Sequence, residues 1–94
     1  MALQYPLRPF NRLEIVSLNL NQNGVYGLFN GSTCIYIGKG DIRERLLAHL
    51  NGDNPCITKS RPTHWTGEVL AGDPSNREKE LIIELRPACN QKIG

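Results

Sequence analysis

The residues from Val25 to Ile37 constrain the fold of this chain more than any other part. Two runs rich in β-branched and aromatic residues, 25–29 and 33–37, flank the turn-forming residues Asn30-Gly31-Ser32. This pattern is the strongest short-range signal for a β-hairpin. We therefore expect two neighbouring antiparallel strands here.

Tyr26 and Tyr36 lie in opposite strands of this hairpin, and the pairing register decides whether they share a face. A two-residue Asn30-Gly31 loop would pair Phe29 with Ser32 and send the two phenols to opposite faces. A three-residue loop would place them on the same face. Because tyrosine is also an ordinary strand residue, the local signals leave both registers open.

The residues after the hairpin predict one helix, one strand and a second helix. Gly38-Lys39-Gly40 is expected to end the second strand, and Asp41 is a suitable N-cap for the helix that follows. Asp73-Pro74 is expected to open the last helix, with Asp as the cap and Pro at the first position. The predicted elements are a helix over 42–50, a loop over 52–63, a strand over 64–70 and a helix over 74–85. The order ββαβα predicts an α/β fold with a small, three-stranded, mainly antiparallel sheet flanked by helices.

The chain has room for one small domain, since it contains 94 residues. Residues 1–23 are expected to form an N-terminal extension, and residues 24–94 the domain itself. Apolar residues in 12–20 fit either a short helix or an extended arm. The stretch 19–24 is polar and rich in turn-forming residues, which favours a boundary there.

Composition excludes some classes of protein and permits others. A net charge of +2 is compatible with nucleic-acid binding without indicating it. Three cysteines, far apart and without a C-x-x-C pair, favour reduced thiols over a disulfide framework. The chain starts without a signal-peptide pattern and has no apolar run long enough for a membrane span, so we expect a cytoplasmic protein with no membrane contact.

Basic groups gather around the start and one edge of the predicted helix 42–50. Arg45 and His49 are spaced i, i+4 beside the apolar stripe, whereas Arg43 lies at its other edge. The pair is able to face one phosphate, although a surface arginine beside a semi-buried histidine would look the same. Gly38 and Lys39 precede the helix and are candidates for phosphate binding, but a strand-to-helix turn needs glycine in any case.

One glutamate of the last predicted helix points toward the core. The apolar stripe of this helix consists of Leu81, Ile82 and Leu85. Glu78 lies at its centre, whereas the other two glutamates of the helix lie on the polar face. A carboxylate in such a position is costly unless it is paired, caps the helix or holds a cation. A capping box from Ser75 is the competing explanation.

These residues together resemble the GIY-YIG nuclease superfamily over Gly24 to Asn90. The first signature element is Gly24-Val25-Tyr26, with Val in place of Ile, and the second is Tyr36-Ile37-Gly38, which is followed by Lys39. Arg45 with His49 matches the first-helix pair of the family, and Glu78 and Asn90 match its metal-binding glutamate and later asparagine. The stretch from Glu78 onward is similar to the N-terminal nuclease domain of the incision subunit of bacterial nucleotide-excision repair.

The resemblance implies a metal-dependent DNA endonuclease that hydrolyses phosphodiester bonds. It implies that Glu78 holds one Mg²⁺ or Mn²⁺ and that Arg45 binds the phosphate. Tyr26 would be the general base or a relay to one, and Tyr36, Lys39 and His49 would position water and phosphate or carry the proton. Asn90 would orient the site. Because family members place both tyrosines in one active site, the resemblance also favours the same-face register of the hairpin, with a three-residue loop.

The expected contacts with DNA rest on a basic and aromatic group of residues, Lys59, Arg61, His64 and Trp65. These side chains suit backbone contacts or stacking on an unpaired base, although Trp65 also suits a core position. With no separate DNA-reading domain, sequence specificity is expected to be low unless a homodimer or a partner protein supplies it. The alternatives are a catalytically silent nucleic-acid-binding module and a protein-interaction subunit in which Glu78 only caps the helix.

Overall fold

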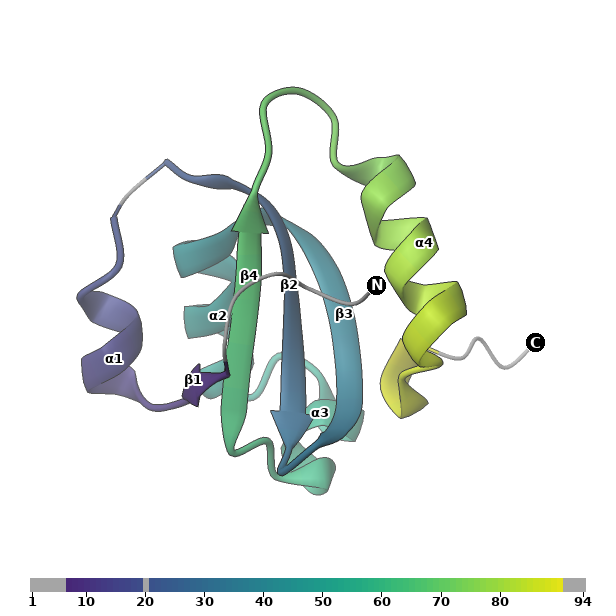
Figure 1. The fold of residues 1–94 in the computed structure, drawn as a ribbon. Coiled ribbons are helices and arrows are strands. Elements are labelled where there is room, and N and C mark those ends of the chain that lie inside the picture. Colours follow the sequence, from purple (N-terminus) through teal and green to yellow (C-terminus); the bar gives the residue numbers. More distant parts are fainter. Residues whose placement is uncertain (1–6, 20, 91–94) are drawn as a thin grey trace.

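A four-stranded antiparallel sheet with the strand order β1-β4-β2-β3 forms the centre of the molecule (Figure 1). The computed structural model describes residues 7–19 and 21–90. The elements are β1 (Arg8–Pro9), α1 (Arg12–Val16), β2 (Asn23–Asn30), β3 (Thr33–Asp41), α2 (Ile42–Leu50), α3 (Pro55–Ser60), β4 (His64–Val69), α4 (Ser75–Leu85) and the 3₁₀ turn η1 (Ala88–Asn90). The predicted class and the ββαβα order of the main elements are confirmed, with four strands in place of three.

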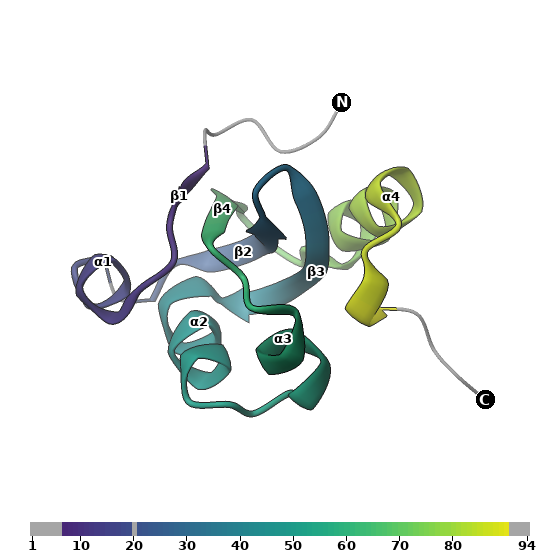
Figure 2. The same ribbon diagram turned by 90° about the horizontal axis from the view of Figure 1, so that it is seen from below.

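Helices cover both faces of the sheet (Figure 2). On one face, α2 and its neighbours enclose a core of eight buried residues: Ile15, Tyr26, Leu28, Ile35, Ile42, Leu46, Ile57 and Trp65. On the other face, α4 packs Leu81 against Val25 and Ile37. The central strand β2 is therefore buried on both sides, and its six inner residues are all buried.

The hairpin between β2 and β3 places both tyrosines on the α2 face, as expected, but by a different route. Asn30 pairs with Thr33 across a two-residue Gly31-Ser32 turn, so the predicted three-residue loop is wrong. A β-bulge then shifts the register, because Leu28 pairs with Tyr36 and leaves Ile35 as the extra residue. Tyr26 consequently lies opposite Gly38, with Tyr36 on the diagonal.

Two local predictions fail between the hairpin and β4. The glycines around Lys39 do not end β3, which continues to Asp41 because the strand still pairs with β2 there. The predicted loop over 52–63 contains helix α3, which begins at Pro55 after the Asn54 side chain caps it. The Asp41 cap and the limits of α2 are confirmed, since Asp41 Oδ1 accepts a hydrogen bond from the Glu44 amide.

The segment before β2 packs against the rest of the fold. Residues 12–16 form a helix rather than an arm, Ile15 is fully buried, and Arg8 and Pro9 pair with Trp65 and His64 of β4. The division into an extension, 1–23, and a domain, 24–94, stays a prediction, and residues 1–6, 20 and 91–94 lie outside the described part of the chain.

The start of α4 differs from both explanations considered for it. Pro74 is the N-cap rather than the first helical residue, and it offers no side-chain hydrogen bond. Asp73 instead accepts hydrogen bonds from the amide and hydroxyl of Ser75. Because Ser75 is the first helical residue and not the cap, the Ser75–Glu78 capping box does not form.

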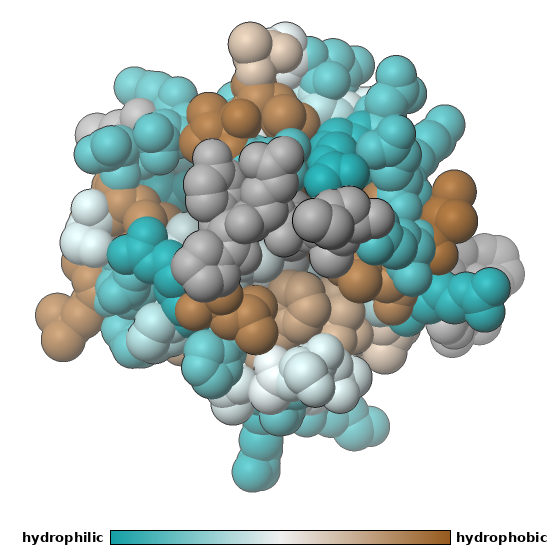
Figure 3. Space-filling view, in the orientation of Figure 1, coloured by the Kyte–Doolittle hydropathy of each residue, from teal (hydrophilic) through white to brown (hydrophobic). Residues whose placement is uncertain are grey.

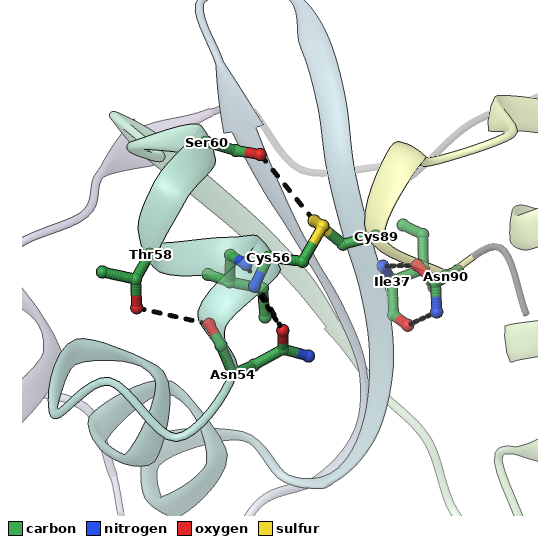
Figure 4. Close-up of a disulfide and its surroundings, with 8 residues drawn as sticks. Ile37, Asn54, Cys56, Thr58, Ser60, Cys89 and Asn90 are labelled. Atoms are coloured by element: carbon green, nitrogen blue, oxygen red, sulfur yellow. Dashed lines mark hydrogen bonds between the residues drawn. A yellow bond between two sulfur atoms is a disulfide. The ribbon is translucent and has the colours of Figure 1, made fainter. Parts of the chain in front are cut away.

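A disulfide joins Cys56 of α3 to Cys89 of η1 (Figure 4), so the expectation of reduced thiols throughout is wrong. The Cα atoms of the pair are 5.7 Å apart although the residues are separated by 33 positions. Their proximity depends on the fold, because α3 and η1 both contact β3. Cys34 is a free thiol.

Hydrophilic residues cover most of the face seen in Figure 3, with hydrophobic residues beside the atoms drawn in grey. Within residues 7–19 and 21–90, no helix has the length and apolar character needed to cross a membrane.

Candidate active site

Tyr26 and Tyr36 pack together over Gly38, where no larger residue would fit. The ring centroids of Tyr26 and Tyr36 are 6.2 Å apart. A Cβ atom at Gly38 would lie 2.3 Å from the Tyr26 hydroxyl oxygen and 2.8 Å from Tyr36 Cε2, both far inside contact distance. Glycine at position 38 is therefore required by the packing of both phenols, and its part in phosphate binding stays a prediction.

His49 of α2 completes this cluster and binds Tyr26 directly. Its ring centroid is 5.6 Å from that of Tyr26 and 5.2 Å from that of Tyr36. The Tyr26 hydroxyl and His49 Nε2 are 2.8 Å apart and share a buried hydrogen bond. His49 thus faces both tyrosines from α2.

Asp53 belongs to the same cluster, and the sequence patterns did not select it. Its Oδ1 lies 2.7 Å from His49 Nδ1, and its Oδ2 lies 3.4 Å from Arg45 Nη2. The signal available in the sequence is an acidic residue four positions after His49. It was missed because Asp53 lies beyond the predicted end of the helix, where helical spacing no longer applies.

Arg45 lies at the rim of the cluster. It interacts with Tyr26, Tyr36 and Asp53, and the Tyr26 hydroxyl is the main reason why the pKa of Arg45 is raised. The guanidinium is held by a carboxylate on one side and keeps nearly half of its side-chain surface exposed. This position leaves donors available to an approaching anion.

Lys39 and Glu78 lie at the edge formed by β3 and α4. Lys39 Nζ donates to Ser75 Oγ at 2.8 Å and lies 3.7 Å from Glu78 Oε1. Glu78 is close enough to Tyr36 for its charge to help raise the pKa of that phenol, after the larger effect of burial. The Asp41 carboxylate already accepts a hydrogen bond from an amide at the N-terminus of α2. Lys39 is therefore a better candidate for binding an anion here than this helix end.

Asn90 supports β3 from behind the cluster. Its Oδ1 accepts a hydrogen bond from the Ile37 amide at 2.6 Å, and its Nδ2 donates to the Ile37 carbonyl at 2.8 Å (Figure 4). Ile37 lies between Tyr36 and Gly38, so Asn90 fixes the backbone of the second signature element. Its observed contacts are with protein backbone.

The four residues expected to contact DNA differ in exposure. Lys59 and Arg61 are exposed at the end of α3. His64 Nδ1 hydrogen-bonds to the Thr63 hydroxyl. Trp65 packs into the core, and Arg8 Cζ lies over its ring, 5.6 Å from the ring centroid. Trp65 is therefore a core residue in this structure.

Burial controls the protonation of the cluster. Burial raises the pKa of Tyr26 far above its usual value, and the neighbouring Tyr36 adds to this effect, so the phenol is protonated at neutral pH. Burial also lowers the pKa of His49, although the Asp53 carboxylate opposes that change. The cluster thus holds a neutral phenol beside a neutral imidazole.

Solved structures share this arrangement of strands and helices. The GIY-YIG N-terminal endonuclease domain of UvrC from Thermotoga maritima, bound to magnesium as its catalytic divalent cation, matches with a TM-score of 0.72 and 25% identity over 86% of this chain and 100% of that one. A variant of that domain with alanine in place of one asparagine, also bound to the cation, matches with a TM-score of 0.73 and 23% identity over 87% of this chain and all of that one.

No protein-family model matches the sequence, and no curated protein matches it. The likeness to known proteins is therefore carried by the three-dimensional structure and by the short motifs that the fold brings together. The expectation drawn from those motifs is confirmed at this level: the chain has the fold of a GIY-YIG endonuclease domain.

Proposed function

We propose that this protein is a metal-dependent DNA endonuclease that hydrolyses phosphodiester bonds. The observation that carries the proposal is the convergence of Tyr26, Tyr36, Arg45 and His49 on one face of the sheet, with Glu78 at the adjoining edge. Phosphodiester hydrolysis requires a proton acceptor for water, a cation at the phosphate and help for the leaving oxygen. This cluster contains groups suited to the first two needs.

The residues present fit one divalent cation held by Glu78. Its side chain is 20% exposed and its nearest cationic partner, Lys39, is 3.7 Å away, so the carboxylate is not locked in a close ion pair. The described residues contain no cluster of three or more His, Cys, Asp or Glu side chains that would hold a metal alone. Mg²⁺ typically keeps several waters and binds one or two carboxylates together with substrate phosphates, which matches this setting. Mn²⁺ has similar ligand preferences.

When bound, the cation would supply charge neutralisation at the phosphate and acidify a bound water. Arg45 would donate to the non-bridging phosphate oxygens, where its planar group matches the geometry. The high pKa of Tyr26 makes a free phenolate unfavourable. Tyr26 is therefore better suited to relay a proton, taking one from the attacking water while giving its own to His49 Nε2, 2.8 Å away. Tyr36 would position water and phosphate beside it.

The remaining predicted residues would serve substrate binding. Lys39 would contact phosphate at the β3 edge, and Lys59, Arg61 and His64 would make backbone contacts that do not depend on sequence. Trp65 is the exception, because it is buried in the core and would not stack on a base. With only such contacts, we propose low intrinsic specificity, supplemented by a homodimer or a partner protein, and action in the cytoplasm.

The test is cleavage of supercoiled plasmid by the purified protein. We expect nicking with Mg²⁺ or Mn²⁺ and none with EDTA. Arg45→Ala and Glu78→Ala are each expected to abolish nicking while the fold is kept. Arg43→Ala, on the opposite edge of α2, and Glu80→Ala, on the exposed face of α4, are matched controls that should still cut.

Two outcomes would contradict the proposal in different ways. Cutting that survives in both Arg45→Ala and Glu78→Ala would show that the site lies elsewhere. A protein that cuts no form of DNA but binds it in a salt-dependent manner would be the silent binding module. If the protein does cut, a cleavage panel of single-stranded, duplex, branched and flapped DNA identifies the preferred substrate.

A further inference from the structure

Asp53 lies at the end of a chain of hydrogen bonds that passes through the centre of the site. The chain runs from Asp53 Oδ1 to His49 Nδ1 at 2.7 Å, and from His49 Nε2 to the Tyr26 hydroxyl at 2.8 Å. The imidazole between them is only 1% exposed. Solvent therefore has little access to either ring nitrogen, and the two protein partners decide which nitrogen carries the proton.

An ionised carboxylate accepts hydrogen bonds and donates none. Beside Asp53, the neutral His49 ring is thus stabilised with its proton on Nδ1, which leaves the lone pair of Nε2 facing the Tyr26 hydroxyl. The opposite tautomer would place the Asp53 oxygen against an unprotonated nitrogen and would remove the acceptor for the phenol proton. We infer that Asp53 is a positioning residue that fixes the tautomer of His49, so that His49 can receive the proton of Tyr26. This inference rests on the endonuclease function proposed above.

The local backbone shows how the carboxylate is directed back over the helix that precedes it. The Gly52 amide donates to the His49 carbonyl at 3.1 Å, and the Asp53 amide donates to the Ala48 carbonyl at 3.2 Å. Gly52 has a φ of +85°, a left-handed conformation that glycine adopts at little cost. The end of α2 thereby turns so that Asp53 returns to the ring of His49.

The second oxygen of Asp53 contacts Arg45, so one carboxylate restrains both the proton acceptor and the phosphate-binding group. The Arg45 and Asp53 side chains are 44% and 33% exposed, and an ion pair with that much exposure contributes little to folding. A stabilising role alone is therefore a weak explanation for this arrangement. The contacts of Asp53 with His49 and Arg45 are instead suited to orienting these two side chains.

The proton transfers balance over the reaction. The water oxygen forms a bond to phosphorus as the bond between phosphorus and the 3′ oxygen breaks. The water proton passes to the Tyr26 oxygen, and the Tyr26 proton passes to His49 Nε2, which leaves a charged imidazolium beside the ionised Asp53. The 3′ oxygen takes its proton from solvent, and His49 later returns its proton through Tyr26 to the water that replaces the product.

Nuclear magnetic resonance of nitrogen-15-labelled protein tests the tautomer without reference to cleavage. Long-range proton–nitrogen spectra distinguish the two ring nitrogens, and His64→Gln identifies the signals of His49. We expect Nδ1 of neutral His49 to be protonated in the wild type. In Asp53→Ala we expect the population to move toward the Nε2-protonated form, and Asp53→Glu should restore part of the original state. A wild-type ring protonated on Nε2 would overturn the inference.

Cleavage kinetics provide the second readout. The titratable and charged groups that face His49 in the described residues are Tyr26 of β2, Tyr36 of β3, Arg45 of α2 and Asp53 itself. Loss of the carboxylate lowers the pKa of His49, so the acid limb of the kcat profile should move to lower pH. The plateau of kcat should fall by roughly 10²-fold, within the range by which a positioned base contributes. Glu44→Ala, an exposed acid on the same helix, is the matched control and should change neither quantity.

The two proposals fail in distinguishable ways. If the wild type cuts no DNA, the endonuclease proposal fails, and the tautomer measurement still decides the role of Asp53. If the wild type cuts DNA but Asp53→Ala changes neither the tautomer nor the acid limb, Asp53 is not a positioning residue and the endonuclease proposal stands.

Discussion

The two flanks of the candidate active site are built in opposite ways. The buried flank, made of Tyr26 and His49 with the part-exposed Asp53 at its outer end, is linked by hydrogen bonds of 2.8 and 2.7 Å around a ring that is 1% exposed. The open flank, made of Lys39, Ser75 and Glu78, has a charged pair 3.7 Å apart, and the Lys39 side chain is 44% exposed. One flank is held by short hydrogen bonds, whereas the charged pair of the other is long and its lysine is partly exposed.

This difference suits the two tasks that hydrolysis combines. Proton transfer needs fixed short distances, which buried hydrogen bonds provide. Binding of a cation and a phosphate needs groups that exchange water and each other for the ligand, so tight internal pairing would be a disadvantage. The buried flank should therefore govern the rate of the chemical step, and the open flank the binding of substrate.

The largest effect that sharpens the comparison is expected from Tyr26→Phe. Removal of the hydroxyl breaks the buried hydrogen-bond chain, so kcat should fall by roughly 10²–10⁴-fold, the usual contribution of a general acid or base. The free energy of unfolding should fall by only about 1–3 kcal/mol, because one buried partner on His49 is left unpaired. Single-turnover cleavage and chemical denaturation measure the two quantities.

Tyr36→Phe is the matched control for this prediction, since Tyr36 packs on the same face without donating to His49 Nε2. We expect it to reduce kcat by no more than about tenfold, because only a contact that positions water is lost. Equal losses of kcat in the two variants would mean that the hydrogen bond to His49 has no special part in the reaction.

Loss of the Cys56–Cys89 disulfide is expected to affect stability more than chemistry. The bond connects α3, on the face of the buried flank, with η1, which contacts β3 next to the open flank. Since it closes a loop with a sequence separation of 33, its loss in Cys56→Ser with Cys89→Ser should lower the free energy of unfolding by roughly 3–4 kcal/mol.

Cleavage at low temperature should change little in this double variant, because Asn90 keeps its own two hydrogen bonds to Ile37. Thermal denaturation with and without a reducing agent is the measurement, and Cys34→Ser is the control that should keep the full response to reduction. A double variant as stable as the wild type would show that the covalent link is not needed to hold η1 against β3.

Much of this architecture was predictable because local and helical patterns dictate it. The hairpin, the Asp41 cap, α2, β4 and the last turn of α4 follow from turn residues, caps and apolar spacing. The choice of Arg45 and Glu78 over their neighbours followed from the same spacing. These signals involve residues only a few positions apart, so the sequence alone contains them.

The features that were missed depend on distant parts of the chain. The bulge at Ile35 places both tyrosines on one face, and no turn signal encodes it. The Cys56–Cys89 pair and the burial of Trp65 under Arg8 arise only when separate elements meet. Asp53 is near His49 in sequence, but its approach depends on the conformation of Gly52 beyond the helix. These features depend on tertiary contacts, which the spacing of apolar residues along the sequence does not reveal.

The buried flank should also make stability depend on pH in a defined direction. Burial lowers the pKa of His49 below its ordinary value of 6.5, so the unfolded chain binds a proton more readily than the folded one. The stability of the fold should then be complete above about pH 6.5 and should decrease as the pH falls through the pKa of the folded state. One group contributes at most about 1.4 kcal/mol per pH unit. Chemical denaturation between pH 8 and pH 5 (about the range in which histidine titrates) measures this slope, which His49→Gln should reduce and His64→Gln should leave in place.

The smallest effect is expected on the open flank from Lys39→Met. Methionine keeps the length of the side chain and removes its charge, so the pair with Glu78 and the hydrogen bond to Ser75 are both lost. Because an exposed pair of this kind contributes about 0–1 kcal/mol, the melting temperature should hardly change.

Substrate binding should weaken by up to about tenfold, since one phosphate contact is lost, and the dependence of binding on salt should decrease by about one counterion. Lys79→Met, at an exposed lysine of α4, is the matched control and should change neither affinity nor salt dependence. If Lys39→Met instead reduced kcat at saturating DNA as strongly as Tyr26→Phe, the division between a flank that binds and a flank that transfers protons would be wrong.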